Sequence, residues 1–119
     1  MEWRVRGIRG AITVSEDTPQ AISEGVKTLL GEILKRNRFS LHEVAGVFFT
    51  TTPDLTSAFP ATFAREIGWE VPFLGGVEMA VPGAPPRCIR VLILVNTTRR
   101  PEEIQHVYLN DARLLRPDL

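Results

Sequence analysis

An arginine lies inside the most apolar run of this chain, and its position is the first sign of chemistry. The run covers residues 87–97 and otherwise consists mainly of β-branched and aliphatic residues, which is typical of a central strand buried on both faces. The guanidinium of Arg90 cannot lose its charge, so burial requires an anionic or strongly accepting partner. That partner is either a carboxylate of the protein, such as Glu78, or a bound ligand. We favour the ligand and predict an anion-binding site with Arg90 at its floor.

A small set of polar groups elsewhere in the chain fits the same chemistry. The full set is Arg9, Arg65, Arg90, Arg116, Glu78, Tyr108 and the backbone of Gly75-Gly76. Cations with a few fixed donors and acceptors suit a small anion that carries carboxylates. They also suit a reaction that needs only positioning and charge stabilisation.

Other kinds of catalysis lack their residues in this sequence. It contains no nucleophile elbow, no phosphate-binding loop and no dinucleotide-binding glycine fingerprint. His42 and His106 have no cysteine or carboxylate at ligand spacing, so we expect neither a metal site nor a cofactor. Cys88 lies among strand residues, where a cysteine is more often a packed small hydrophobe than a reactive thiolate.

The N-terminal part of the chain predicts the first strand, at residues 3–14, because apolar and polar residues alternate there. Arg4 and Arg6 share one face of this strand, whereas Arg9 lies on the other unless a bulge intervenes. Either of the two inner glycines can mark such a bulge or a close approach of another element.

Three further parts of the chain are predicted to be extended. Residues 44–52 read as a second buried strand, and residues 71–79 as a third. The third is interrupted at Gly75-Gly76, where backbone amides can approach a ligand closely. Residues 106–109 and 112–115 are expected to supply the last extended pieces.

Two helices are predicted between these strands. The first begins at Asp17-Thr18-Pro19, where a capping side chain precedes a proline, and it ends near Asn37. The second covers residues 61–67, with Pro60 at its start and Gly68 at its end. The first helix carries one apolar stripe, formed by Ile22, Val26, Leu29, Leu30, Ile33 and Leu34. We therefore predict an α+β fold, a mixed β-sheet with helices packed on one face.

Composition places the chain among ordinary globular proteins. Its 119 residues suit a single domain over residues 1–119, and 44% of them are hydrophobic and 24% charged. A net charge of zero gives no electrostatic reason to expect nucleic acid or a membrane as partner. The single cysteine rules out an internal disulfide and suits a reducing cytoplasm. No signal peptide or membrane-spanning run is apparent, so we expect a cytoplasmic protein.

Short fragments along the whole chain carry a resemblance to a known family. They are Arg6-Gly-Ile-Arg-Gly-Ala11, Thr13-Val14, Thr52-Pro-Asp-Leu55, Phe59-Pro-Ala61, Ala64-Arg-Glu66, Val77-Glu-Met79, Cys88-Ile-Arg-Val91, His106-Val-Tyr-Leu109 and Leu115-Arg-Pro-Asp-Leu119. In this order the chain resembles the monofunctional, trimeric chorismate mutases of mixed α/β architecture, which are unrelated to the all-helical class. Each fragment alone is weak, but the ordered set is specific.

The resemblance implies a homotrimer that converts chorismate to prephenate on the route to phenylalanine and tyrosine. The reaction is a Claisen [3,3] rearrangement without a covalent intermediate. By this resemblance Arg90 faces the ether oxygen, which gains negative charge as its C–O bond breaks. Arg9 and Tyr108 hold a carboxylate of the substrate. Glu78 accepts a hydrogen bond from the ring hydroxyl and complements positive charge on the ring.

The same resemblance places other residues around the substrate, at the interface between subunits. Those implied to come from the adjacent subunit are Phe59, Ala61, Thr62 and Arg65. Those implied to lie nearby are Leu74, Gly75, Gly76, Leu115 and Arg116. Relatives of this family often carry a cysteine at the position of Gly75 and a lysine at that of Thr62. Here Gly75 leaves only backbone donors, and Thr62 removes a charge that can attract a dianionic substrate.

Two other functions compete with a mutase. One is a trimeric imine- or enamine-hydrolysing deaminase, a family with a similar fold whose interface arginine holds a carboxylate. The other is a non-catalytic module in which Arg90 and Tyr108 bind a carboxylate metabolite. The deaminase motifs are not those of this chain, and nothing in the sequence marks a surface for a partner protein.

Overall fold

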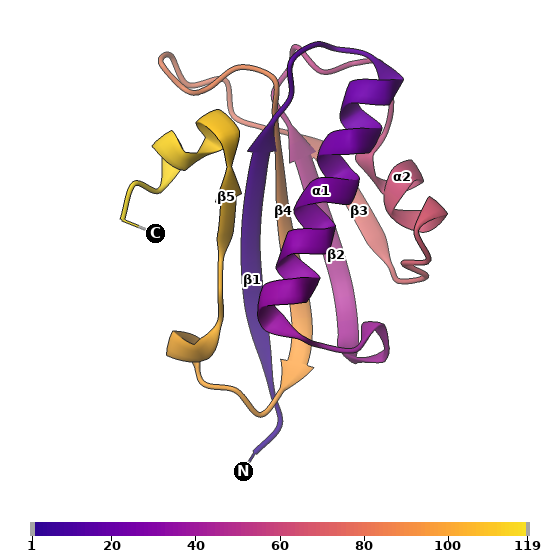
Figure 1. The fold of residues 1–119 in the computed structure, drawn as a ribbon, viewed down its shortest axis with the longest axis vertical. Coiled ribbons are helices and arrows are strands. Elements are labelled where there is room, and N and C mark those ends of the chain that lie inside the picture. Colours follow the sequence, from indigo (N-terminus) through magenta and orange to yellow (C-terminus); the bar gives the residue numbers. More distant parts are fainter. Residues whose placement is uncertain (1, 119) are drawn as a thin grey trace.

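A mixed five-stranded sheet organises the computed structural model, which describes residues 2–118 (Figure 1). The strands lie in the order β3-β2-β4-β1-β5. β4 is antiparallel to both of its neighbours, and the edge strands β3 and β5 run parallel to β2 and β1. Their bounds are Arg4–Thr13 for β1, Val44–Thr51 for β2, Phe73–Val77 for β3, Cys88–Thr97 for β4 and Val107–Leu109 for β5. The predicted α+β class is confirmed.

Two helices, α1 (Pro19–Asn37) and α2 (Pro60–Glu66), pack on the same face of the sheet (Figure 1). The side chain of Thr18 caps α1 by accepting a hydrogen bond from the backbone N–H of Ala21. The helix ends where Arg38 adopts a left-handed conformation. Both ends of α1 therefore lie where the sequence predicts them. No helix of the described residues has the length and apolar character needed to cross a membrane.

The main hydrophobic core lies between α1 and the sheet. The apolar stripe of α1 is buried there, except that Leu34 is only half-buried. A Cβ atom at Gly10 of β1 would lie 2.7 Å from Cδ1 of Ile33, so this glycine lets the helix pack directly on the strand. The pairing of β1 with β4 runs without a bulge, and Arg9 therefore points to the face of the sheet opposite α1.

The sheet face opposite the helices is called the open face here, and it is less buried than the sequence predicts. The strand over residues 87–97 was expected to be buried on both faces, yet Arg90, Leu92 and Leu94 are only half-buried. The helices cover one face alone. At one end of the open face lies a small packed cluster comprising Ala11, Cys88, Tyr108, Ala112 and Leu115.

Two other segments differ from their predicted form. β3 is shorter than the expected 71–79 strand and continues through Gly75-Gly76, because both glycines pair with β2. Residues 112–115 are not extended but belong to a 3-10 helix, η3 (Asn110–Leu115). Asn110 turns the chain with a φ of 57°, and its side chain donates to the carbonyl of Thr13.

Short turns complete the fold. Two further 3-10 turns, η1 (Leu41–Glu43) and η2 (Pro101–Glu103), precede β2 and β5. Leu119, which ends the last fragment of the family resemblance, lies outside the described residues.

Candidate active site

One row of residues crosses all five strands and builds the centre of the site. Strand pairing sets Tyr108 of β5 beside Ala11 of β1, and Ala11 beside Arg90 of β4. The row continues to Thr50 of β2 and Gly76 of β3. Paired residues point to the same face of a sheet, which here is the open face. Ala11 is fully buried within this row, between Tyr108 and Arg90.

Arg90 makes an ion pair with Glu78, which follows β3 in the chain. Nη1 of Arg90 lies 3.4 Å from Oε1 of Glu78, and 37% and 24% of the two side chains are exposed. The backbone N–H of Glu78 donates to the carbonyl of Thr51, so β2 fixes the main chain at this acid. The sequence left two partners open for Arg90, a carboxylate of the protein or a bound ligand, and this geometry is compatible with both. The carboxylate contacts one end of the guanidinium, and the remaining N–H donors suit a second anion.

Two hollows meet at Arg90. The first, of about 270 Å³, is lined by Arg9, Gly10, Phe48, Thr50, Arg90, Val91, Leu92 and Tyr108. The second, of about 440 Å³, is lined by Thr52, Glu78, Met79, residues 81–85, Cys88, Arg90 and Leu115. The second hollow is in the size range of pockets for small ligands and the first is slightly smaller, and both combine apolar walls with a few polar groups. Arg90 lines both hollows. The structure thus brings Arg9 and Tyr108 to one side of Arg90, and Glu78 and Leu115 to the other.

A second group of cationic side chains, Arg9 and Arg116, lies near His106 at the β5 end of the row. The backbone N–H of Arg9 donates to Nδ1 of His106 over 3.0 Å, so this ring carries its proton on Nε2. Burial lowers the pKa of His106, and the nearby charges of Arg9 and Arg116 lower it further. Arg116 makes two hydrogen bonds to Asp118, of 3.0 and 2.8 Å. The Asp118 carboxylate raises the pKa of Arg116, with a smaller contribution from Tyr108.

The one cysteine is not a nucleophile in this setting. Cys88 is buried at the start of β4, and burial raises its pKa to about 11. Its thiol therefore stays protonated at neutral pH, as the sequence analysis expects of a packed small residue.

Other predicted site residues lie away from these hollows in the described chain. Phe59 directly precedes α2 and is 79% exposed, and Leu74 on the edge strand is 64% exposed. Arg65 on α2 stacks over the ring of Phe73, with its Cζ atom 5.3 Å from the ring centre. Ala61 and Thr62 lie in the first turn of α2, and Gly75 lies on β3. One chain alone therefore presents two separate groups of predicted site residues.

Asp17 positions the segment that carries Phe59. Its carboxylate accepts hydrogen bonds from the backbone N–H and the hydroxyl of both Thr56 and Ser57. These bonds, with that of the Ser57 hydroxyl the largest contribution, hold the pKa of Asp17 below its usual range. Sequence reasoning missed this role, since Asp17 read as part of the helix start. It also missed Thr50, which is the first of three consecutive threonines at the end of the predicted 44–52 strand.

Comparison with known proteins gives this arrangement a family. The model of the family described as "Chorismate mutase type I" matches residues 5–119. The chain belongs to the chorismate mutase type I family. One relative is chorismate mutase AroH of Thermus thermophilus, which is 56% identical to this chain over 117 residues. That alignment covers 97% of this chain and 96% of the relative.

Two more proteins support the assignment to the type I family. Chorismate mutase AroH of Bacillus subtilis (strain 168) is 43% identical over 117 residues, which are 97% of this chain and 92% of the relative. A solved chorismate mutase from Clostridium thermocellum superposes with a TM-score of 0.89 at 40% identity, covering 92% of this chain and 98% of that one. These matches confirm the family resemblance and the mutase activity predicted from the sequence, and they do not support a deaminase or a binding module.

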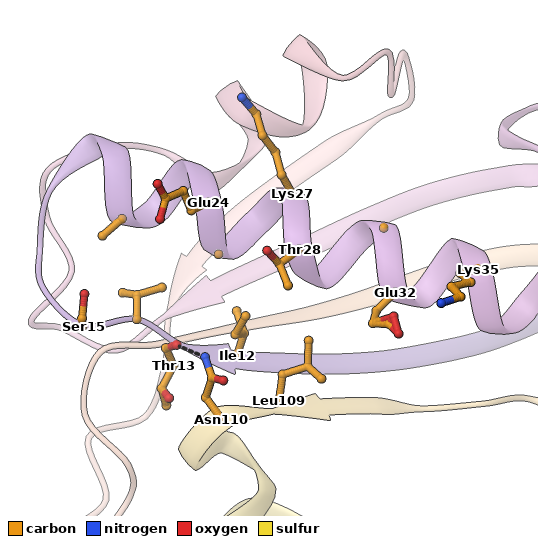
Figure 2. A pocket seen from close by; sticks show the side chains of 14 residues that line it. Ile12, Thr13, Ser15, Glu24, Lys27, Thr28, Glu32, Lys35, Leu109 and Asn110 are labelled. Atoms are coloured by element: carbon orange, nitrogen blue, oxygen red, sulfur yellow. Dashed lines mark hydrogen bonds between the residues drawn. The ribbon is translucent and has the colours of Figure 1, made fainter.

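A larger hollow lies elsewhere and has a different character. It is a groove of about 660 Å³ between α1 and the strands β1 and β5, on the helix side of the sheet (Figure 2). Acidic and basic side chains of α1, among them Glu24, Lys27 and Glu32, stand along it without converging on a common point (Figure 2). Lys27 is already paired with Glu66 at 3.4 Å. The smaller hollows around Arg90, where the predicted site residues gather, are therefore the candidate active site.

Proposed function

We propose that the hollows around Arg90 bind chorismate and convert it to prephenate. The observation that carries this proposal is the row that sets Arg90 and Tyr108 on one face of the sheet, together with the ion pair between Arg90 and Glu78. The rearrangement breaks a C–O bond and forms a C–C bond within one molecule. It transfers no proton and needs no cofactor, metal or covalent intermediate. Fixed charges that match the transition state are therefore sufficient for catalysis.

Each charged group has a task in this reaction that its position supports. Arg90 donates to the ether oxygen, where negative charge develops as the C–O bond breaks. Glu78 accepts from the ring hydroxyl and stabilises positive charge on the ring. Arg9 and Tyr108, which line the same hollow as Arg90, hold a substrate carboxylate. Arg116 adds a positive charge beside Tyr108.

We further propose that the active form is a homotrimer in which each site lies between two subunits. The open face carries exposed apolar residues, among them Phe48 and Leu74, and these require a cover. In a ring of three copies, one patch of each subunit meets a different patch of the next. The segment with Phe59, Ala61, Thr62 and Arg65 would then close the hollows of a neighbouring copy. Leu74, Gly75 and Gly76 on the edge strand would line the seam.

The remaining properties follow from this assignment. One sheet and one main core support a single catalytic domain over residues 1–119. The partner of the protein is its small-molecule substrate, and neither nucleic acid nor a membrane has a role. We propose that it acts in the cytoplasm, where its single buried cysteine stays reduced.

An assay of chorismate consumption tests the proposed site. The wild-type chain is expected to consume chorismate and release prephenate, whereas an Arg90→Ala variant of unchanged fold is expected to lose nearly all of this activity. Equal rates for the two chains would place the chemistry elsewhere in the molecule.

A further inference from the structure

Thr50 contacts the carboxylate of Glu78, the acidic group of the site. Neither the sequence motifs nor the names of the relatives indicate a role for this threonine. Oγ1 of Thr50 donates to Oε2 of Glu78 over 2.7 Å, and the other oxygen of that carboxylate faces Arg90 at 3.4 Å. Thr50 and Arg90 are directly paired on neighbouring strands. We propose that Thr50 is a positioning residue of the mutase site, whose hydroxyl fixes the Glu78 carboxylate between β2 and β4. This inference rests on the function proposed above.

The geometry explains why Glu78 needs such a partner. Its residue lies just beyond the last residue of β3, an edge strand, and its long side chain has several rotatable bonds that must be fixed. The backbone bond from Glu78 to Thr51 fixes the main chain but leaves the carboxylate free to turn. Each carboxylate oxygen therefore needs its own partner. Arg90 serves Oε1, and Thr50 serves Oε2.

Thr50 is well suited to fix a carboxylate. A β-branched side chain has restricted rotation about χ1, and here it stands on a strand that is paired on both sides. Its hydroxyl is thus held by the sheet and not by a flexible loop. Sites built on such rigid elements hold their groups more precisely than sites on loops.

The hydroxyl can be separated from the shape of the side chain. Valine has nearly the shape of threonine and favours strands as well, but it cannot donate a hydrogen bond. Serine keeps the donor and loses only the methyl group. Thr51, the next residue, points its side chain to the helix side of the sheet and holds Glu78 only through its main-chain carbonyl. Thr51→Val keeps that carbonyl and therefore serves as a matched control.

The test measures kcat and KM for chorismate in Thr50→Val, Thr50→Ser and Thr51→Val, each made in the full chain. Loss of a positioned contact can reduce turnover about a hundredfold. We expect Thr50→Val to lower kcat by about ten- to a hundredfold with a smaller change in KM. Thr50→Ser is expected to retain most of the activity, and Thr51→Val to match the wild type. Circular dichroism checks the fold, and Thr50→Ala replaces Thr50→Val if the valine variant does not fold.

A double-mutant cycle separates positioning from a structural role. In a Glu78→Ala background there is no carboxylate to hold, so Thr50→Val should change the residual rate by less than about twofold. An equal loss in both backgrounds, or a wild-type rate for Thr50→Val, would overturn the inference. If Glu78→Ala itself kept the wild-type rate, the role proposed for Glu78 would fail, and that of Thr50 with it. A failure of Thr50 alone would leave Glu78→Ala strongly impaired.

Discussion

The two faces of this sheet come from the same strands and are used for different purposes. On the helix face Ile8, Ile12, Ile89 and Ile93 are fully or almost fully buried under α1. On the open face the alternate residues of β1 and β4 include Arg9 and Arg90, and they border hollows. Because side chains alternate along a strand, adjacent residues belong to different environments. Stability and activity should therefore be separable by changing one face at a time.

The largest effect on activity is expected on the open face, at Arg90. Arg90→Ala should lower kcat at least roughly a thousandfold, because one preorganised donor at a developing oxyanion is worth about 3–4 kcal/mol. Arg90→Lys should recover only part of the rate, since a point charge does not replace the planar fork. Steady-state kinetics on folded variants provides the measurement. A nearly normal kcat in Arg90→Ala would remove the open face from the mechanism.

A smaller loss is expected at Glu78. Glu78→Asp keeps the charge but withdraws the acceptor by one methylene, an error that can cost about a hundredfold. Glu78→Gln keeps the length and removes the charge, and it should also lose activity. Rates are measured as for Arg90. Wild-type rates in both variants would mean that Glu78 serves only as the structural partner of Arg90.

The helix face should give the opposite result. Ile33 is fully buried on α1, and Ile33→Ala should lower the free energy of unfolding by roughly 2–5 kcal/mol. Its kcat, measured well below the melting temperature, should stay within about twofold of the wild type. Denaturant unfolding and steady-state kinetics on the same sample test both statements. A large fall in kcat without a loss of stability would break the division between the two faces.

The smallest effect is expected from pH. The rearrangement transfers no proton, so kcat should be nearly constant from about pH 5.5 to 9. Stability should still fall in acid. The pKa of His106 is lowered in the folded chain, so its contribution is complete above the ordinary histidine pKa and is lost as pH falls through the lower folded value. Asp17, whose pKa is also lowered, adds to this loss at still lower pH. A bell-shaped kcat profile centred near neutrality would instead indicate acid–base chemistry, for example by His106.

The sequence predicts the regular elements well because local signals specify them. The start of α1 at Thr18-Pro19 and the alternating pattern of β1 can each be read from residues that are adjacent in the sequence. Residues 112–115 were predicted wrongly because η3 depends on bonds to Thr13, almost a hundred positions earlier in the chain. The prediction that β4 is buried on both faces was also wrong, because its alternate leucines, Leu92 and Leu94, lie on the face that a single chain leaves open.

The candidate site was predictable only in part, for a similar reason. Arg90 stands out as a charge in an apolar run, and the family resemblance supplies roles for Glu78 and Tyr108. Thr50 is a common strand residue, and its partner lies 28 positions away, so no local pattern reveals their hydrogen bond. Which copy supplies Phe59 and Arg65 also depends on how chains assemble.

The most direct test of the central claim is complementation between two inactive chains. Arg90→Ala disables the open-face side of each site, and Arg65→Ala disables the side proposed to come from the next subunit. The two variants are unfolded, mixed in equal amounts and refolded together, and exchange of subunits is verified with a tag on one chain. In random trimers roughly a quarter of all sites combine two intact sides, so about a quarter of the wild-type activity should return. If the mixed trimers stay as inactive as their parents, each site lies within one chain, and the proposed division between subunits is wrong.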